Sequence, residues 1–277
     1  MIGSIIGDMS GSIYEGPYKN PNRKNFILLP NNCYFTDDSI LSVAVADVLL
    51  NKLDYAKTIR LYYSRYPYGG YGKAFKKWAK SENDPAYNSY GNGSAMRISP
   101  IVWAFETKED ILNEAKKSAE CTHNHEEGIK GAQAIALAGF MARKGCSKAE
   151  IKLIIESEFK YDLVNIDRKF DSSCQGSVPN AIAAFLDSDN FVDCIKRAVF
   201  YGGDSDTVAA MAGTIAQPFY NNIPKSSIRI VFTKLPDDLA RVIVEFTKKY
   251  IDKNFVRPAH IGRQAELYNL YRSIIKK

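Results

Sequence analysis

Residues 201–216 read YGGDSDTVAAMAGTIA and place two aspartates and a threonine directly before an almost wholly apolar stretch. Apolar residues recur at helical spacing from here to residue 220, and a helix that is apolar on most sides lies at the centre of a protein. Alternating strand patterns are nearly absent from the rest of the chain. Helical spacing is found in residues 39–50, 55–66, 109–122, 126–143, 148–159, 178–188, 190–201, 207–220 and 237–252. The sequence therefore predicts one compact, all-α, multi-helix domain over residues 1–277.

The first segment repeats glycine at every fourth position, as Gly3, Gly7 and Gly11. On a helix these glycines share one face and allow a neighbouring backbone to approach closely, so we expect a tightly packed helix. Asp8 and Glu15 are seven residues apart and would share a face if this helix runs that far. Taken alone, each is expected to be a surface acid.

Composition narrows the class of protein. The 277 residues carry 37 basic and 31 acidic side chains, a net charge of +6, without an Arg/Lys stripe interleaved with aromatics. We expect a solvated surface and no nucleic-acid binding. The five scattered cysteines lack metal-site or redox spacing, and the first apolar run is too short for a signal or a membrane span. We therefore expect a cytoplasmic protein with reduced thiols and without membrane association. We also expect a monomer, because no long sticky surface is evident in the sequence.

A second acidic cluster, in FTDDSILSVAVADVLL (35–50), has the same chemistry as the first. One interpretation is helix capping, since Asp and Thr accept hydrogen bonds from unpaired N–H groups. However, a cap needs one side chain, and clustered, desolvated carboxylates take up protons unless a cation neutralises them. Donors that are all oxygen favour magnesium or manganese. If the two helix ends converge, two ions could be held by Thr36, Asp37, Asp38, Asp204, Asp206 and Thr207.

Two further motifs are polar. In YGNGSAMRISPI (90–101), Gly91, Asn92, Gly93 and Ser94 form a flexible turn ahead of Met96 and Arg97. Exposed backbone N–H groups suit a phosphate, although a turn without a ligand is the alternative.

In CTHNHEEGIKG (121–131), His123 and His125 have i, i+2 spacing, which points to opposite sides of a helix and makes a poor chelate. A hydrogen-bonding histidine at a helix start is the favoured interpretation.

Together these motifs resemble the ADP-ribosylglycohydrolases, an all-helical family, over the whole chain. The resemblance depends on five ordered segments: GDMSGSIYEG (7–16), FTDDS (35–39), GNGSAMR (91–97), THNHEEG (122–128) and GGDSDTVAAMAG (202–213). It implies an orthogonal helical bundle in which the six residues of the two acidic clusters bind two Mg²⁺ or Mn²⁺ ions. Glu15 matches the acid near the scissile bond, whereas Ser39 departs from the usual TDDT motif.

The resemblance also implies hydrolysis at the anomeric carbon of the distal ribose, with Glu15, Asp38 and Asp204 as candidate catalytic residues. The ADP-ribose cleft would be lined by Gly91, Asn92, Gly93, Ser94, Met96 and His123. The expected substrate is an ADP-ribosylated protein with an arginine linkage, and the product is ADP-ribose; nucleic acid enters only as an ADP-ribosylated substrate. Alternatives are a serine- or O-acetyl-ADP-ribose hydrolase, another magnesium-dependent hydrolase such as a phosphatase, and a catalytically silent ADP-ribose binder.

Overall fold

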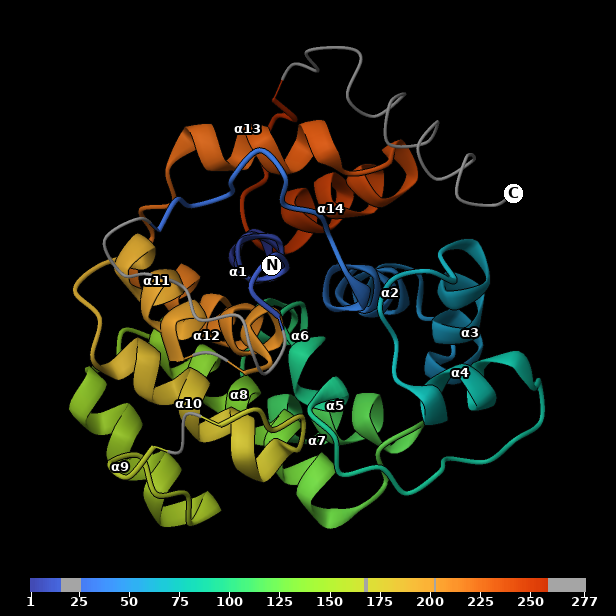
Figure 1. The fold of residues 1–277 in the computed structure, drawn as a ribbon, viewed down its shortest axis with the longest axis horizontal. Coiled ribbons are helices and arrows are strands. Elements are labelled where there is room, and N and C mark those ends of the chain that lie inside the picture. The colour runs from blue at the N-terminus through green and yellow to red at the C-terminus, as the bar shows by residue number, and fades with distance from the viewer. Residues whose placement is uncertain (16–25, 167–168, 202, 259–277) are drawn as a thin grey trace.

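The protein is described by a computed structural model that covers residues 1–15, 26–166, 169–201 and 203–258. These residues form fourteen helices and no β-strand, apart from one isolated bridge between Gly91 and Ser173 (Figure 1), which confirms the all-α prediction. The helices are α1 (Ile2–Gly11), α2 (Asp37–Asn51), α3 (Tyr55–Arg65), α4 (Lys73–Lys80), α5 (Gly93–Met96), α6 (Ile101–Ala104), α7 (Lys108–Glu120), α8 (Glu126–Arg143), α9 (Lys148–Phe159), α10 (Cys174–Leu186), α11 (Phe191–Tyr201), α12 (Ser205–Tyr220), α13 (Lys225–Lys234) and α14 (Asp237–Tyr250).

Helix α12, which follows the opening acidic cluster, lies at the centre of the molecule. Its residues are buried from Ser205 to Gln217, as its apolar sequence predicts. Helices α1, α8, α10 and α11 pack around it, and in Figure 1 α1 is seen end-on beside it. The central position of α12 fixes the location of the acidic residues at its amino end.

Helix α1 packs on α12 at backbone distance, and the predicted glycine face makes this possible. A methyl group at Gly7 would lie 2.1 Å from the carbonyl oxygen of Ala209, and one at Gly11 would lie 2.4 Å from the Cα of Asp206. Because backbone atoms cannot rotate away, this contact requires residues without a side chain. The close contact brings the carboxyl end of α1 against the amino end of α12.

The predicted and observed helices differ in places. Helices α8 and α9 have the predicted bounds, whereas α1 ends at Gly11, so Glu15 lies beyond it and shares no helix face with Asp8. Helices α4, α5, α6 and α13 lie in segments for which the sequence predicts no helix. Their apolar patterns are too short to show a period.

Two smaller predictions concern membranes and thiols. Across the described ranges, no helix has both the length and the apolar character needed to cross a membrane. All five cysteines are free, three of them buried and two half-buried, in agreement with the prediction of reduced thiols.

Candidate metal and ligand site

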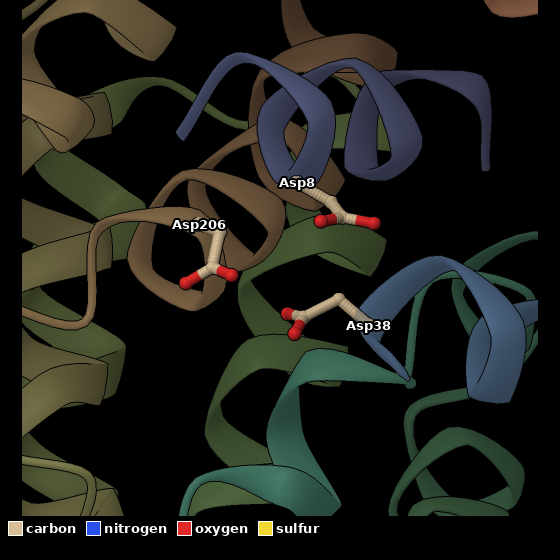
Figure 2. A group of neighbouring side chains, drawn as sticks. All are labelled: Asp8, Asp38 and Asp206. Atoms are coloured by element: carbon tan, nitrogen blue, oxygen red, sulfur yellow. The ribbon is translucent and has the colours of Figure 1, made fainter. Parts of the chain in front are cut away.

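Three helix ends bring acidic side chains together. Asp8 of α1, Asp38 of α2 and Asp206 of α12 point toward one another (Figure 2), and each offers a carboxylate oxygen within 4.8 Å of the others. A second group consists of Glu15, Asp204 and Asp206, whose carboxylate oxygens also lie within 4.8 Å of one another. The two acidic clusters that are far apart in sequence therefore converge, and Asp206 belongs to both groups.

The acids of the two groups other than Asp8 line a cavity of about 340 Å³. Most of the residues expected at the site from the sequence line it: Glu15, Thr36, Asp37, Asp38, Gly91, Asn92, Gly93, Met96, His123, Asp204, Asp206 and Thr207. Ser94 does not line the cavity, because its hydroxyl is buried and donates to the carbonyl oxygen of Gly128 at 2.7 Å. Metal-site and ligand-site candidates thus share one cavity.

Asp8 corrects one expectation. It is fully buried, not a surface acid, and its carboxylate accepts hydrogen bonds from the amino end of α2. The donors are the Thr36 N–H at 3.0 Å, the Thr36 hydroxyl at 2.8 Å, the Ser39 N–H at 3.1 Å and the Ser39 hydroxyl. Every residue of α1 is buried, and the amino end of α2 covers the Asp8 carboxylate, which explains why a residue expected at the surface is buried.

The capping interpretation holds for one acidic cluster and fails for the other. Thr36 is the N-cap of α2, and its hydroxyl accepts from the Asp38 N–H. Asp204 occupies the N-cap position of α12, but its side chain makes no capping bond. Its carboxylate instead accepts from the Asn92 side chain at 2.7 Å. Capping therefore does not account for the acids on α12.

Asp38 provides the test of whether a cation fits. One of its oxygens, Oδ2, accepts from the Thr207 hydroxyl at 3.2 Å and lies 3.3 Å from the Thr36 hydroxyl, which donates to the nearer Asp8. The other oxygen, Oδ1, is buried and has no hydrogen-bond partner among the described residues. A buried carboxylate oxygen with no partner is strongly unfavourable unless something neutralises it. Since the surrounding donors are oxygens of other carboxylates and hydroxyls, a hard divalent cation fits this environment.

The raised pKa values of the clustered carboxyl groups also favour a bound cation. Burial raises the pKa of Asp8 to about 6, against the hydrogen bonds from Ser39 and Thr36 that lower it. Burial and then the neighbouring carboxylates raise the pKa of Asp37, Asp38 and Asp206 well above the ordinary range. Without a cation these carboxyl groups hold protons at a pH where exposed ones are ionised.

Asp37 belongs to neither of the two close groups of acids. It is half-buried, and a methyl group at Gly70 would lie 3.1 Å from its Oδ1. Its backbone N–H donates to the carbonyl oxygen of Gly69 at 2.7 Å. Asp37 therefore lines the cavity from the side of residues 69–75.

The GNG turn is tied to the acidic site. Besides the bond from Asn92 to Asp204, the Asn92 N–H donates to the Ser172 carbonyl oxygen at 2.8 Å and the Gly91 N–H donates to the Ser89 hydroxyl at 3.1 Å. These two amides are already used within the protein. Since Ser94 does not line the cavity, Gly93 is the residue of the turn whose backbone N–H group is left as a candidate for holding phosphate.

The two histidines have different surroundings. His123 is buried, its Nδ1 lies 2.7 Å from the Thr122 hydroxyl, and burial lowers its pKa well below the usual value, so it is neutral at pH 7. His125 is the N-cap of α8 and accepts from the Glu127 N–H at 3.1 Å. The prediction of a histidine at a helix start is confirmed for His125.

Part of the cavity wall was missed by sequence reasoning. Gly70, Gly72, Lys73 and Phe75 line it at the start of α4, and Phe170 lines it from the segment before α10. The glycines of YGGYGK (68–73) were a signal that could have been used, since glycine-rich turns before a helix often approach a ligand. Nothing in the sequence around Phe170 marks it.

The buried acids make the stability of the metal-free protein depend on pH. Because their pKa values are raised on folding, the folded protein binds more protons than the unfolded chain, and stability falls as the pH rises. We expect the free energy of unfolding, measured with urea in the presence of chelator, to decrease from pH 6.5 to 8. His123 and the amino group of Met1, whose pKa values burial lowers, act in the opposite direction, but the carboxyl groups with raised pKa values outnumber them. The variant Asp206→Asn should flatten the slope, and an identical slope in both proteins would contradict the assignment.

Comparison with known proteins gives a consistent result. A family model described as ADP-ribosylglycohydrolase matches residues 1–250. "ADP-ribosylhydrolase ARH3" of Homo sapiens is 27% identical, with 82% of this chain and 86% of that protein covered. "ADP-ribosylarginine hydrolase Tri1" of Pseudomonas putida (strain GB-1) is 24% identical, with 79% and 69% covered. A solved "ADP-ribosylglycohydrolase-related protein complex" has a similar fold, with a TM-score of 0.71, 24% identity, and 89% and 95% of the two chains covered.

Proposed function

The chain belongs to the ADP-ribosylglycohydrolase family, and on that premise we propose that it hydrolyses the glycosidic bond between ADP-ribose and an acceptor. The observation that carries this proposal is the meeting of two groups of acids, joined at Asp206, at one cavity with the GNG turn. A silent relative that only binds ADP-ribose would have no need for this complete set of buried acids.

The residues that would hold two magnesium or manganese ions are Thr36, Asp37, Asp38, Asp204, Asp206 and Thr207. A divalent cation suits this set of residues because Oδ1 of Asp38 has no hydrogen-bond partner and because the ligand atoms of the cluster are all oxygens. When bound, such ions polarise the ribose hydroxyls and lower the pKa of a nearby water. The acids place this chemistry at one end of the cavity.

Glu15 is the candidate general acid. It is exposed at the rim of the cavity, and one of its oxygens lies within 4.8 Å of those of Asp204 and Asp206. A carboxyl group there can give a proton to the leaving group or take one from the attacking water, while Asp38 and Asp204 hold the water and the ribose. A proton-transfer role of this kind contributes about 10²- to 10⁴-fold to the rate.

The ADP part of the ligand would lie along the GNG turn. His123 is neutral there, and Asn92 is fixed by its bond to Asp204, so both present defined hydrogen-bonding groups. Gly93 packs closely against His123, since a methyl group at this position would lie 3.1 Å from the His123 ring.

For the acceptor we propose arginine. Glu15 is exposed at the rim of the cavity, and a negative charge at that position suits a cationic guanidinium leaving group. The Pseudomonas putida relative is named for the same linkage. Serine and O-acetyl linkages are the alternatives that the experiment must separate.

The test is release of ADP-ribose from arginine-, serine- and DNA-linked substrates and from O-acetyl-ADP-ribose. We expect turnover of the arginine-linked substrate with magnesium or manganese and none with chelator. Turnover that chelator leaves unchanged would contradict the metal-dependent mechanism. Micromolar binding of ADP-ribose with no turnover of any substrate would instead establish the silent binder.

A further inference from the structure

Asp8 is buried between the two helices that carry the candidate metal ligands but belongs to neither. It projects from α1 toward the amino end of α2 (Figure 2), where it accepts the hydrogen bonds of Thr36 and Ser39 from residues 28 and 31 positions further along the chain. These N–H groups are among those that a helix leaves unpaired at its start. Asp8 thus acts as a cap for α2 that is supplied by a different helix.

The hydrogen-bonding capacity of this carboxylate is largely used. Its Oδ2 accepts from the N–H groups of Thr36 and Ser39 and from the Ser39 hydroxyl, and its Oδ1 accepts from the Thr36 hydroxyl. A carboxylate offers about four acceptor positions in all. Although Asp8 lies close to Asp38 and Asp206, this pattern fits a residue that orients the ligands better than a ligand itself.

The backbone around Asp8 is anchored on the other side. Gly7 and Gly11, which flank it on α1, press against the backbone of α12 at Ala209 and Asp206. One short segment of α1 is therefore fixed to α12 by backbone packing and to α2 by four hydrogen bonds. The separation of the two acidic helix ends depends on this segment.

We propose that Asp8 is a positioning residue that sets the geometry of the metal site by holding the start of α2 against α12. This inference builds on the proposed metal-dependent function. Groups that orient metal ligands without touching the metal typically contribute 10- to 100-fold to metal affinity. Ser39 has a part in this arrangement, because its hydroxyl completes the contact between α2 and Asp8.

The test compares Mn²⁺ binding in single variants by isothermal titration calorimetry at a temperature where each protein is folded. We expect Asp8→Asn to weaken the affinity about 10- to 100-fold and to keep the number of ions bound. Ser39→Ala leaves the charge of the site unchanged, so a loss of affinity in this variant separates positioning from simple electrostatics. Ser39→Thr restores a hydroxyl and should recover what Ser39→Ala loses.

The matched control is Ser42→Ala, one turn further along α2, where the buried hydroxyl donates to the Met96 carbonyl oxygen at 3.4 Å and not to Asp8. We expect it to bind Mn²⁺ like the wild type. If Asp8→Asn and Ser39→Ala lower only the melting temperature in chelator and leave Mn²⁺ affinity unchanged, the positioning role is wrong. It is also wrong if Asp8→Asn removes one bound ion, since Asp8 would then be a ligand.

Failure of the positioning role and failure of the proposed function give different results. Wild-type protein that binds no Mn²⁺ would overturn both the metal-dependent function and the role of Asp8 within it. If the wild type, Asp8→Asn and Ser39→Ala all bind Mn²⁺ with the same affinity, only the role of Asp8 is overturned. If Asp8→Asn does not fold, the comparison of Ser39→Ala with Ser39→Thr and Ser42→Ala decides the question.

Discussion

Replacing Asp206 with asparagine is expected to lower the turnover of ADP-ribosylated substrate by ~10³-fold or more. Asp206 is the one acid shared by the two close groups, so its loss affects both candidate ion positions. Metal ions that stabilise charge in the transition state contribute several kcal/mol, and each 1.36 kcal/mol corresponds to tenfold in rate. The measurement is kcat/KM at saturating magnesium or manganese, together with the thermal shift that added metal produces.

Asp110→Asn provides the matched control for this prediction. Asp110 lies in the first turn of α7, where its N–H donates to the Thr107 hydroxyl in an ordinary exposed cap. The same change of charge at this helix start should leave kcat/KM unaltered. Near wild-type turnover in Asp206→Asn would contradict the placement of the reaction at this cluster, and the thermal shift would show whether metal binding had been retained.

The helices that could be predicted from the sequence are those with long periods or clear caps. Helix α9 begins at Ser147 with a capping box in which Glu150 is the partner residue, and α8 begins at His125 directly before two glutamates. Such local signals fix a boundary without knowledge of the tertiary structure. Helix α4 has eight residues, four of them lysine, and its apolar face becomes evident only where Phe75 and Trp78 are buried.

The sequence predicts which residues form the candidate site, but it does not predict their hydrogen bonds or their burial. The sequence repeats one chemistry at two helix starts, which left open whether the two acidic clusters meet, and the resemblance to a known family implied that they do. It could not show that Asn92 bonds to Asp204, which is 112 residues away, or that Asp8 is buried. A spacing of seven residues predicts a shared helix face and gives no information on which neighbour covers that face.

The same residue types also have different roles at the two helix starts, which sequence alone could not separate. Thr36 caps α2 through its hydroxyl, while Asp204 leaves α12 uncapped and accepts from a side chain across the cavity. Capping is a local interaction, whereas the role of Asp204 depends on how α12 is placed against the GNG turn. The buried, unpartnered oxygen of Asp38 is likewise a property of the assembled fold.

Gly7→Ala is expected to destabilise the protein by about 3 kcal/mol or more, at the upper end of what overpacking usually causes. The added methyl group would lie 2.1 Å from the carbonyl oxygen of Ala209 and 2.7 Å from the N of Ala210, so α1 and α12 would have to separate.

Gly139→Ala on α8 is the matched control: its methyl group would lie 2.7 Å from Val102 Cγ2, a side-chain atom that can move. In both variants the replacement of glycine by alanine favours the helix by the same amount, about 1 kcal/mol. Urea denaturation in chelator should therefore show the larger loss for Gly7→Ala, and equal losses would mean that the backbone contact between α1 and α12 does not fix their separation. Because Asp8 adjoins Gly7, the same variant should also weaken Mn²⁺ binding at temperatures where it remains folded.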